Sequence, residues 1–405
     1  MVAVTRRSVF LPLTLTLALA AVLTVTACGS GDKPGKSTAT TAAPSPSGTP
    51  VKKEPFTFAL TPAADAKNLP ISTELGTAVT GGKVTTVELV TAGKKVEGAL
   101  RPDGTAWVPA KPLAPGASYT ATVTATGDDG KAETRTTAFS TMARPGSRVG
   151  TGMYLFTGGT YGVAMPVVVE FVDFQVPEAE RAAVARRLFV TSDPPQLGAW
   201  HWFGGNQVLY RPKEYWKPGT KLTVRTGLDG HPLGNGKYGD QERSATVGID
   251  ASSRILEVDN ATKQMVAKKD GQVVRTMKVS LGKTSTPSSS GSLVVMDKLE
   301  KTIFDSSTYG VPANSPDGYR SEIRYAQRLT WSGEFIHAAP WSEGDQGVRN
   351  VSHGCVNVSW ADAEWVFGFT MIGDPVVIKG TERQVKPGNG WTAWDVPWDE
   401  YAKSP

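Results

Sequence analysis

Short segments of alternating apolar and polar residues dominate the chain from about Pro55 to Met142. KVTTVELV, SYTATVTATG and ETRTTAFST all repeat with a period of two residues. This period is typical of strands that bury one face. Turn signals such as Asp103-Gly104 and Asp129-Gly130 separate the segments. The pattern predicts a small β-sandwich over residues 54–145.

The same arrangement returns in residues 146–250. VLYRPKEYWKPGTKLTVRTGLDG parallels AWVPAKPLAPGASYTATVTATGDDG, and in both a strand leads through a Pro/Gly turn into an alternating strand. PEAERAAVARRLF predicts one short helix with Pro177 near its first turn. LAPGASYTATVTA in the first segment resembles the late strands of Ig-like and bacterial wall-protein modules, and the parallel predicts a second Ig-like module. Because no Cys…Trp…Cys framework is present, neither is an antibody-type domain.

After residue 250 the pattern changes. RILEVDNATKQMVAKKDGQVVRTMKVSLG predicts two or three strands, and DPVVIKG predicts a closing strand. Ser359 followed by Asp362 resembles a capping box that opens a short helix ending near Phe369. We therefore expect a mainly β protein: two Ig-like modules, at residues 54–145 and 146–250, and a β-rich domain with a short helix at residues 251–380.

The C-terminal segment, residues 381–405, contains Trp391, Trp394 and Trp398. Three tryptophans are too many to remain in water. We therefore expect this extension to pack on the domain that precedes it.

The N-terminus is typical of an exported protein. Arg6 and Arg7 precede an uncharged apolar run that ends before Cys28, which is the pattern of a signal peptide over residues 1–28. Val-Thr-Ala-Cys resembles a bacterial lipobox, which implies lipidation of Cys28; an ordinary signal peptide or membrane anchor is the alternative. Residues 29–53, rich in Gly, Ser, Thr, Pro and Ala, predict a disordered linker.

Composition adds few constraints. The chain is 40% hydrophobic and 20% charged, as in ordinary globular proteins. A net charge of +5 without a clustered basic face gives no indication of nucleic-acid binding. The sequence contains no glycine-rich nucleotide motif, and we expect no cofactor. If Cys28 is lipidated, Cys355 is the only thiol of the exported part and has no partner for an internal disulfide.

The candidate chemistry lies in VRNVSHGCVNVS, residues 348–359. His353 and Gly354 precede Cys355 directly, and His337 ends the strand-like segment GEFIHAAPW. A free thiol has a pKa of about 8.5 and needs a base or backbone dipoles to react. If the two segments are neighbouring strands, a histidine can remove the thiol proton while Gly354 lets the backbone aim its amides at a substrate. A zinc site of two His and one Cys, or an inert cysteine, is also compatible with these residues.

Residues 336–359, IHAAPWSEGDQGVRNVSHGCVNVS, resemble the signature of YkuD-type L,D-transpeptidases. That signature is a histidine, a spacer, then Ser-His-Gly-Cys with Asn two places after the Cys. DSSTYGVPANSPDGYR, residues 305–320, is similar to the active-site lid of the actinobacterial branch, as are the two β modules and the Trp-rich tail. Ala338 stands where close relatives often have Ser. Because a backbone carbonyl survives this change, we expect activity to survive.

The resemblance implies that the protein cross-links peptidoglycan without a metal. Cys355 would attack the carbonyl at the L-centre of the third stem residue, release D-alanine and form a thioester. An amine of a second stem would then resolve it into a 3→3 link. His337 would be the base and later the acid. Carbapenems would acylate the same thiol.

The resemblance also implies roles for neighbouring residues. The Gly354 and Cys355 amides would hold the oxyanion, helped by the Tyr319 hydroxyl, and His353 would shape the turn. Residues expected to line the donor site or its lid are Tyr309, Tyr319, Ser332, Gly333, Ser352 and Asn357. We expect Trp341 to lie in the core, and we assign no role to His201 or His231.

Other function classes stay open from the residues. Water as the acceptor would make the protein an L,D-carboxypeptidase, and a degenerate last domain would make it a non-catalytic wall-binding lipoprotein. Papain-like and NlpC/P60-like peptidases place Cys before His, the reverse of this chain. Sortases use an arginine after the Cys, but here only Arg383 in the tail follows Cys355, which fits poorly. The expected location is the outer face of the cell membrane, lipid-anchored through Cys28 and facing the wall.

Overall fold

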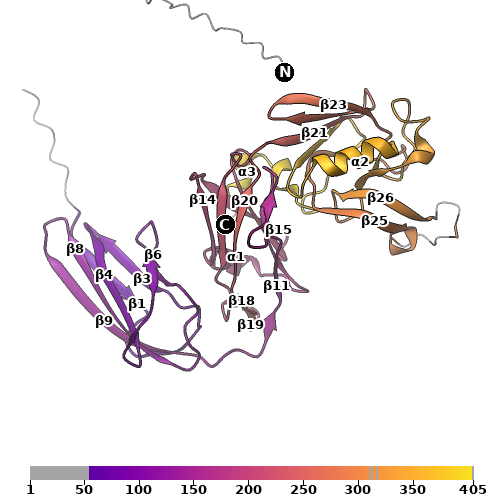
Figure 1. The fold of residues 1–405 in the computed structure, drawn as a ribbon. Helices are drawn as coiled ribbons and strands as arrows, with labels where there is room; N and C mark the ends of the chain where they lie inside the picture. The colour runs from indigo at the N-terminus through magenta and orange to yellow at the C-terminus, as the bar shows by residue number, and fades with distance from the viewer. Residues whose placement is uncertain (1–53, 310–311, 313, 316–317, 404–405) are drawn as a thin grey trace, which may run out of the picture. The chain divides into compact units, whose positions relative to one another are not determined.

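Figure 1 shows the computed structural model of the chain, which describes residues 54–309, 312, 314–315 and 318–403. The predicted signal peptide, Cys28 and the linker of residues 29–53 lie outside these residues. In the described part, no helix has the length and apolar character needed to cross a membrane.

The first module is a β-sandwich of two sheets, with strand orders β1-β3-β7-β6 and β2-β9-β8-β4-β5. Side chains along β8 are alternately buried and more exposed because successive residues of a strand point to opposite faces. This confirms the period-two pattern. The strands are β1 (Thr57–Thr61), β2 (Ala66–Leu69), β3 (Leu75–Thr80), β4 (Gly82–Thr91), β5 (Lys94–Lys95), β6 (Gly98–Leu100), β7 (Ala106–Pro109), β8 (Ser118–Gly127) and β9 (Ala132–Thr141).

The second module has two four-stranded sheets, β11-β13-β16-β15 and β12-β20-β17-β14, and a small sheet β10-β19-β18. The predicted helix is present as α1 (Glu178–Ala185), and Pro177 is its N-cap. The strands are β10 (Arg148–Val149), β11 (Thr151–Met153), β12 (Thr160–Tyr161), β13 (Val167–Phe171), β14 (Leu188–Asp193), β15 (Gly198–Phe203), β16 (Gln207–Pro212), β17 (Lys221–Thr226), β18 (Pro232–Gly234), β19 (Lys237–Gly239) and β20 (Arg243–Ile249).

The third part of the chain contains a six-stranded sheet, β23-β22-β21-β29-β24-β30, and a four-stranded sheet, β25-β26-β27-β28. The strands are β21 (Arg254–Asp259), β22 (Gln264–Lys269), β23 (Gln272–Lys278), β24 (Ser289–Val294), β25 (Asp297–Asp305), β26 (Arg320–Arg328), β27 (Phe335–Ala338), β28 (Val356–Val358), β29 (Pro375–Lys379) and β30 (Arg383–Gln384). Short 3-10 turns are η1 (Ser306–Tyr309), η2 (Pro340–Ser342) and η3 (Thr392–Asp395).

Helix α2 (Trp360–Phe369) follows β28 directly. The Ser359 side chain accepts a hydrogen bond from the Asp362 amide at 3.1 Å, which satisfies one of the free N–H groups of the first turn. The predicted cap is confirmed. Val366 of this helix packs in one apolar cluster with Ile336 of β27 and Val356 of β28. The helix therefore stabilises both strands through this cluster.

The C-terminal segment, which ends in α3 (Trp398–Tyr401), contacts the second module as well as the third part of the chain. The buried Arg211 guanidinium donates to the Ala393 and Val396 carbonyls at 2.9 and 2.8 Å. The rings of Trp394, Trp398 and Tyr401 also lie against it. A buried cation needs such partners. The expectation of packing on the preceding domain alone therefore missed the contact with the second module.

Candidate active site

Strands β27 and β28 bring the two candidate segments together. They pair in parallel, with His337 opposite Asn357. Cys355 lies two residues before Asn357, the spacing at which side chains of an extended chain share a face. His337 and Cys355 line one cavity of about 370 Å³. The condition set from the sequence, that the two segments be neighbouring strands, is met.

Cys355 is a partly buried, free cysteine. It donates to the Gly333 carbonyl, with the sulfur 3.7 Å from the oxygen. Burial raises the pKa of Cys355 to about 12; the backbone N–H of Phe335 opposes this rise, and the Glu334 carboxylate adds to it. At neutral pH the resting nucleophile is therefore a thiol, which needs a base to react.

His337 is 4% exposed and its tautomer is fixed by its neighbour. Its Nδ1 lies 2.9 Å from the Ala338 carbonyl oxygen. Because a carbonyl only accepts, Nδ1 must hold the proton and Nε2 is left as the basic nitrogen. Burial lowers the pKa of His337 to about 4, against the opposite effect of the Ala338 carbonyl. The imidazole is therefore neutral at pH 7 and able to accept a proton.

The backbone around Gly354 is held by two serines. Its φ is +126°, in the region that L side chains rarely adopt. The Gly354 amide donates to Ser352 Oγ at 3.1 Å, and that hydroxyl donates to the Cys355 carbonyl at 2.7 Å. Ser288 Oγ donates to the Gly354 carbonyl at 2.7 Å. An oxyanion at this turn would have to share the Gly354 N–H with Ser352.

Comparisons with known proteins identify the family. A bacterial Ig domain model matches residues 66–232, and the YkuD model, described as an L,D-transpeptidase catalytic domain, matches residues 253–378. The chain is 38% identical over 312 residues to L,D-transpeptidase 2 of Mycobacterium tuberculosis, covering 76% of this chain and 74% of the relative. The chain belongs to the YkuD family of L,D-transpeptidases. It is an extracytoplasmic enzyme that acts on peptidoglycan.

Two further similar proteins are a curated relative and a solved structure. L,D-transpeptidase 5 of Mycobacterium tuberculosis is 35% identical over 344 residues, covering 82% of this chain and 72% of the relative. A solved structure of LdtMt1 in complex with imipenem is 35% identical, with a TM-score of 0.49, and covers 58% of this chain and all of that chain. The single Ig match spans parts of both predicted modules, so the boundary between residues 145 and 146 stays a prediction.

Six residues singled out from the sequence of this L,D-transpeptidase line the cavity. They are Tyr319, His337, Ser352, His353, Cys355 and Asn357. The rings of Tyr319 and His353 lie 5.4 Å apart, and His353 Nε2 lies 3.4 Å from Lys283 Nζ. Asn357 donates to Ser342 Oγ at 3.2 Å. Their roles toward substrate stay predictions.

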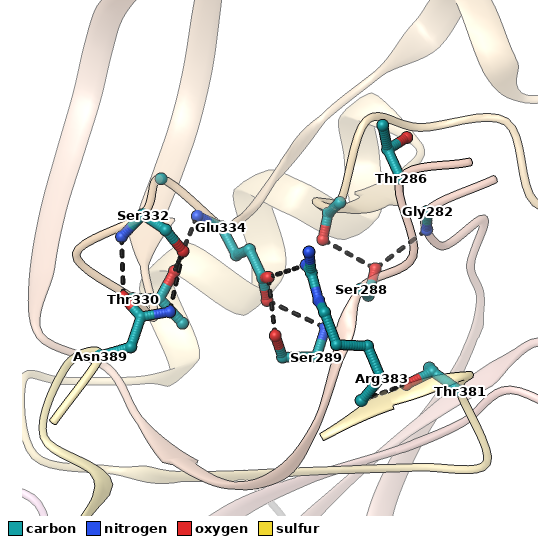
Figure 2. A network of polar contacts seen from close by, with 12 residues as sticks. Gly282, Thr286, Ser288, Ser289, Thr330, Ser332, Glu334, Thr381, Arg383 and Asn389 are labelled. Carbon is teal, nitrogen blue, oxygen red and sulfur yellow. Dashed lines mark hydrogen bonds and ion pairs between the residues drawn. The ribbon is translucent and has the colours of Figure 1, made fainter. Parts of the chain in front are cut away.

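Two other expected donor-site residues, Ser332 and Gly333, are not among the described residues that line this cavity. Ser332 lies in the turn before β27, where its amide and hydroxyl both bond to Asn389 at 2.9 Å (Figure 2). Gly333 contributes its carbonyl, which accepts from the Cys355 thiol. The side chain of Tyr309 lies outside the part of the chain that the structure describes.

Trp341 corrects an expectation. It lies in η2, where the chain leaves the sheet after β27, and its side chain is 64% exposed. It lines the cavity, and its ring lies 6.1 Å from that of His337. The prediction that it lies in the core was wrong, because a tryptophan after a buried strand has the same pattern whether it faces the core or a cleft. Among the described residues, no group of three or more His, Cys, Asp or Glu side chains is placed to hold a metal ion.

Sequence reasoning also missed Glu334 and Arg383. It treated Arg383 only as a tail residue that fits the sortase pattern poorly, but β30 pairs with β24 and brings it near Gly354. A Cβ built on Gly354 would lie 3.7 Å from Glu334 Cγ and 3.8 Å from Arg383 Nη2. No local pattern indicates this proximity, because the pairing joins segments almost a hundred residues apart.

Proposed function

We propose that this enzyme forms 3→3 cross-links between peptidoglycan stem peptides through a thioester on Cys355. The observation that supports this most directly is the pair on the cavity wall: a neutral thiol and a buried histidine whose Nε2 is free to accept a proton. A neutral pair suits general-base catalysis, because the thiol gives up its proton as it attacks.

The proposed reaction has two halves that balance in protons and bonds. Cys355 Sγ attacks the donor carbonyl while His337 Nε2 takes the thiol proton. His337 then passes that proton to the nitrogen of the departing D-alanine, and a thioester remains. The acceptor amine attacks the thioester, loses a proton to His337 and releases the thiolate, which recovers the proton. In this scheme the Ala338 carbonyl keeps the imidazole in the correct tautomer.

The surrounding residues would hold the donor stem and the charge that develops on it. The Cys355 amide, and the Gly354 amide if it is shared with Ser352, would stabilise the oxyanion. The Tyr319 hydroxyl would assist, and Asn357 and Ser352, which line the same cavity, would contact the stem.

Product analysis tests the proposal. We expect the full-length enzyme, purified in detergent and incubated with a disaccharide-tetrapeptide, to yield a 3→3 dimer and free D-alanine by mass spectrometry. Tripeptide and D-alanine without dimer would replace the proposal with an L,D-carboxypeptidase that uses water as acceptor. No reaction together with a Cys355 that resists thiol reagents would support a non-catalytic wall-binding protein.

We also propose that Cys28 is lipidated and anchors the enzyme to the outer face of the membrane. The support is the apolar run that ends in Val-Thr-Ala-Cys and the polar segment after it. Cys28→Ala is expected to move the protein from the membrane to the soluble fraction, or to leave its precursor unprocessed. Cys355→Ala is the matched cysteine control and should stay with membranes. A processed Cys28→Ala protein that remains fully membrane-bound would contradict the anchor.

A further inference from the structure

We propose that Glu334 and Arg383 form a positioning pair that holds the Gly354–Cys355 segment in its reactive arrangement. The inference rests on the proposed nucleophilic role of Cys355. It adds two charged residues to the reaction, neither of which lines the cavity.

Glu334 joins three separate segments through one buried carboxylate. The residue is 5% exposed and lies in the turn between β26 and β27. Its carboxylate accepts from the Ser289 amide at 3.1 Å and from Ser289 Oγ at 2.8 Å, and it forms an ion pair with Arg383 (Figure 2). A buried carboxylate is costly unless it is paired and hydrogen-bonded in this way. The turn, β24 and β30 are therefore fixed to one another.

Two of these segments also hold the nucleophile. The residue before Glu334 is Gly333, whose carbonyl accepts from the Cys355 thiol at 3.7 Å. The residue before Ser289 is Ser288, whose hydroxyl accepts from the Gly282 amide at 2.9 Å and donates to the Gly354 carbonyl at 2.7 Å. The Glu334–Ser289 contact thus connects the turn that accepts a hydrogen bond from the Cys355 sulfur to the strand that donates one to the backbone of the preceding residue.

Arg383 contributes the compensating charge. Its backbone lies opposite Ser289 in the β24–β30 pair, and its guanidinium reaches to 3.8 Å from the position of a Gly354 Cβ. Its side chain is 43% exposed, in contrast to the 6% of Glu334. The Glu334 carboxylate disfavours the thiolate, because it raises the pKa of Cys355. Arg328 opposes that rise in the pKa of Cys355. Arg383, ion-paired with Glu334, offsets part of the same negative charge.

The proposal predicts that loss of Arg383 and loss of Glu334 change the alkylation rate of Cys355 in opposite directions. Arg383→Gln leaves the carboxylate uncompensated and should slow iodoacetamide alkylation of Cys355 about threefold at pH 8. Glu334→Gln leaves the cation uncompensated and should speed it about threefold. The double variant removes both charges and should return close to the parent alkylation rate, but it should still slow dimer formation, because the ion pair between the turn and β30 is lost. Arg383→Lys should retain the parent rate of both. Full pH profiles of alkylation, followed by intact mass in the full-length enzyme, would show the two single variants displaced in opposite directions.

Arg135→Gln and Glu133→Gln are the controls for breaking an ion pair remote from the site: the pair lies on β9 of the first module, and its two side chains are 45% and 42% exposed. They should leave the profile unchanged. Arg383→Gln that behaves like Arg383→Lys, or two single variants displaced in the same direction, would overturn the positioning pair. If Glu334→Gln does not fold, the Arg383 variants alone decide, because that side chain is half exposed. Failure of the proposed function would be distinct: the parent enzyme itself would form no adduct at Cys355.

Discussion

Cys355→Ala is expected to abolish covalent capture of a carbapenem and to lower dimer formation at least about 10⁴-fold. The sulfur is the only atom in the described cavity wall that the proposed mechanism uses as a nucleophile, and no histidine can replace it in forming the thioester. Intact-mass spectra and the rate of 3→3 dimer release measure the two effects.

The substitution is expected to leave the fold intact. Cys355 Sγ makes only weak sulfur hydrogen bonds, to the Gly333 carbonyl and from the Phe335 N–H, and the residue is partly exposed, so removing the sulfur costs little packing. Circular dichroism and thermal unfolding should match the parent enzyme. Cys28→Ala, which removes the other cysteine of the chain, should keep the carbapenem adduct. Dimer formation retained by Cys355→Ala would refute the nucleophile, whatever the state of the rest of the site.

Local patterns were sufficient where the determining contacts are local. The alternation along β8 and the Ser359 cap of α2 each depend on residues within a few positions of one another. The motif around Cys355 also identified its partner His337. The sequence could state their juxtaposition only as a condition, because the register of two strands depends on the whole sheet.

The features that sequence reasoning missed depend on long-range packing. Arg383 comes near Gly354, the residue before the nucleophile, through the β24–β30 pairing. Arg211 of the second module donates hydrogen bonds to two carbonyls of the C-terminal segment. This contact binds the segment to the module, because a buried guanidinium needs acceptors. In each case a charged residue looks like ordinary surface in the sequence and becomes informative only when its burial is known.

The second large effect is expected from His337→Gln, which should slow carbapenem acylation about 10²- to 10⁴-fold. A glutamine amide can still donate to the Ala338 carbonyl but cannot take the thiol proton at neutral pH. His353→Gln is the matched control: His353 contacts Tyr319 at the rim and is expected to shape the turn, so its loss should cost less than about tenfold. Stopped-flow acylation rates of the two variants measure the difference.

The pH dependence separates a base from a packing residue. With a His337 pKa of about 4, the parent rate should rise as pH increases through about 4 and then reach a plateau, because the imidazole is neutral above that value. In His337→Gln this acid limb should disappear. Its residual rate should keep rising at alkaline pH with the thiolate fraction, since the pKa of Cys355 is raised to about 12.

Stability gives an independent check on the same group. The folded enzyme holds His337 neutral below its unfolded pKa of about 6.5, so the unfolded chain binds more protons between pH 6.5 and 4. The free energy of unfolding should therefore fall as the pH drops through this window, and it should fall less in His337→Gln. If the acylation rate and the free energy of unfolding of His337→Gln both fall at acidic pH as they do in the parent enzyme, another group titrates in this range. His337 would then lose its role as the base.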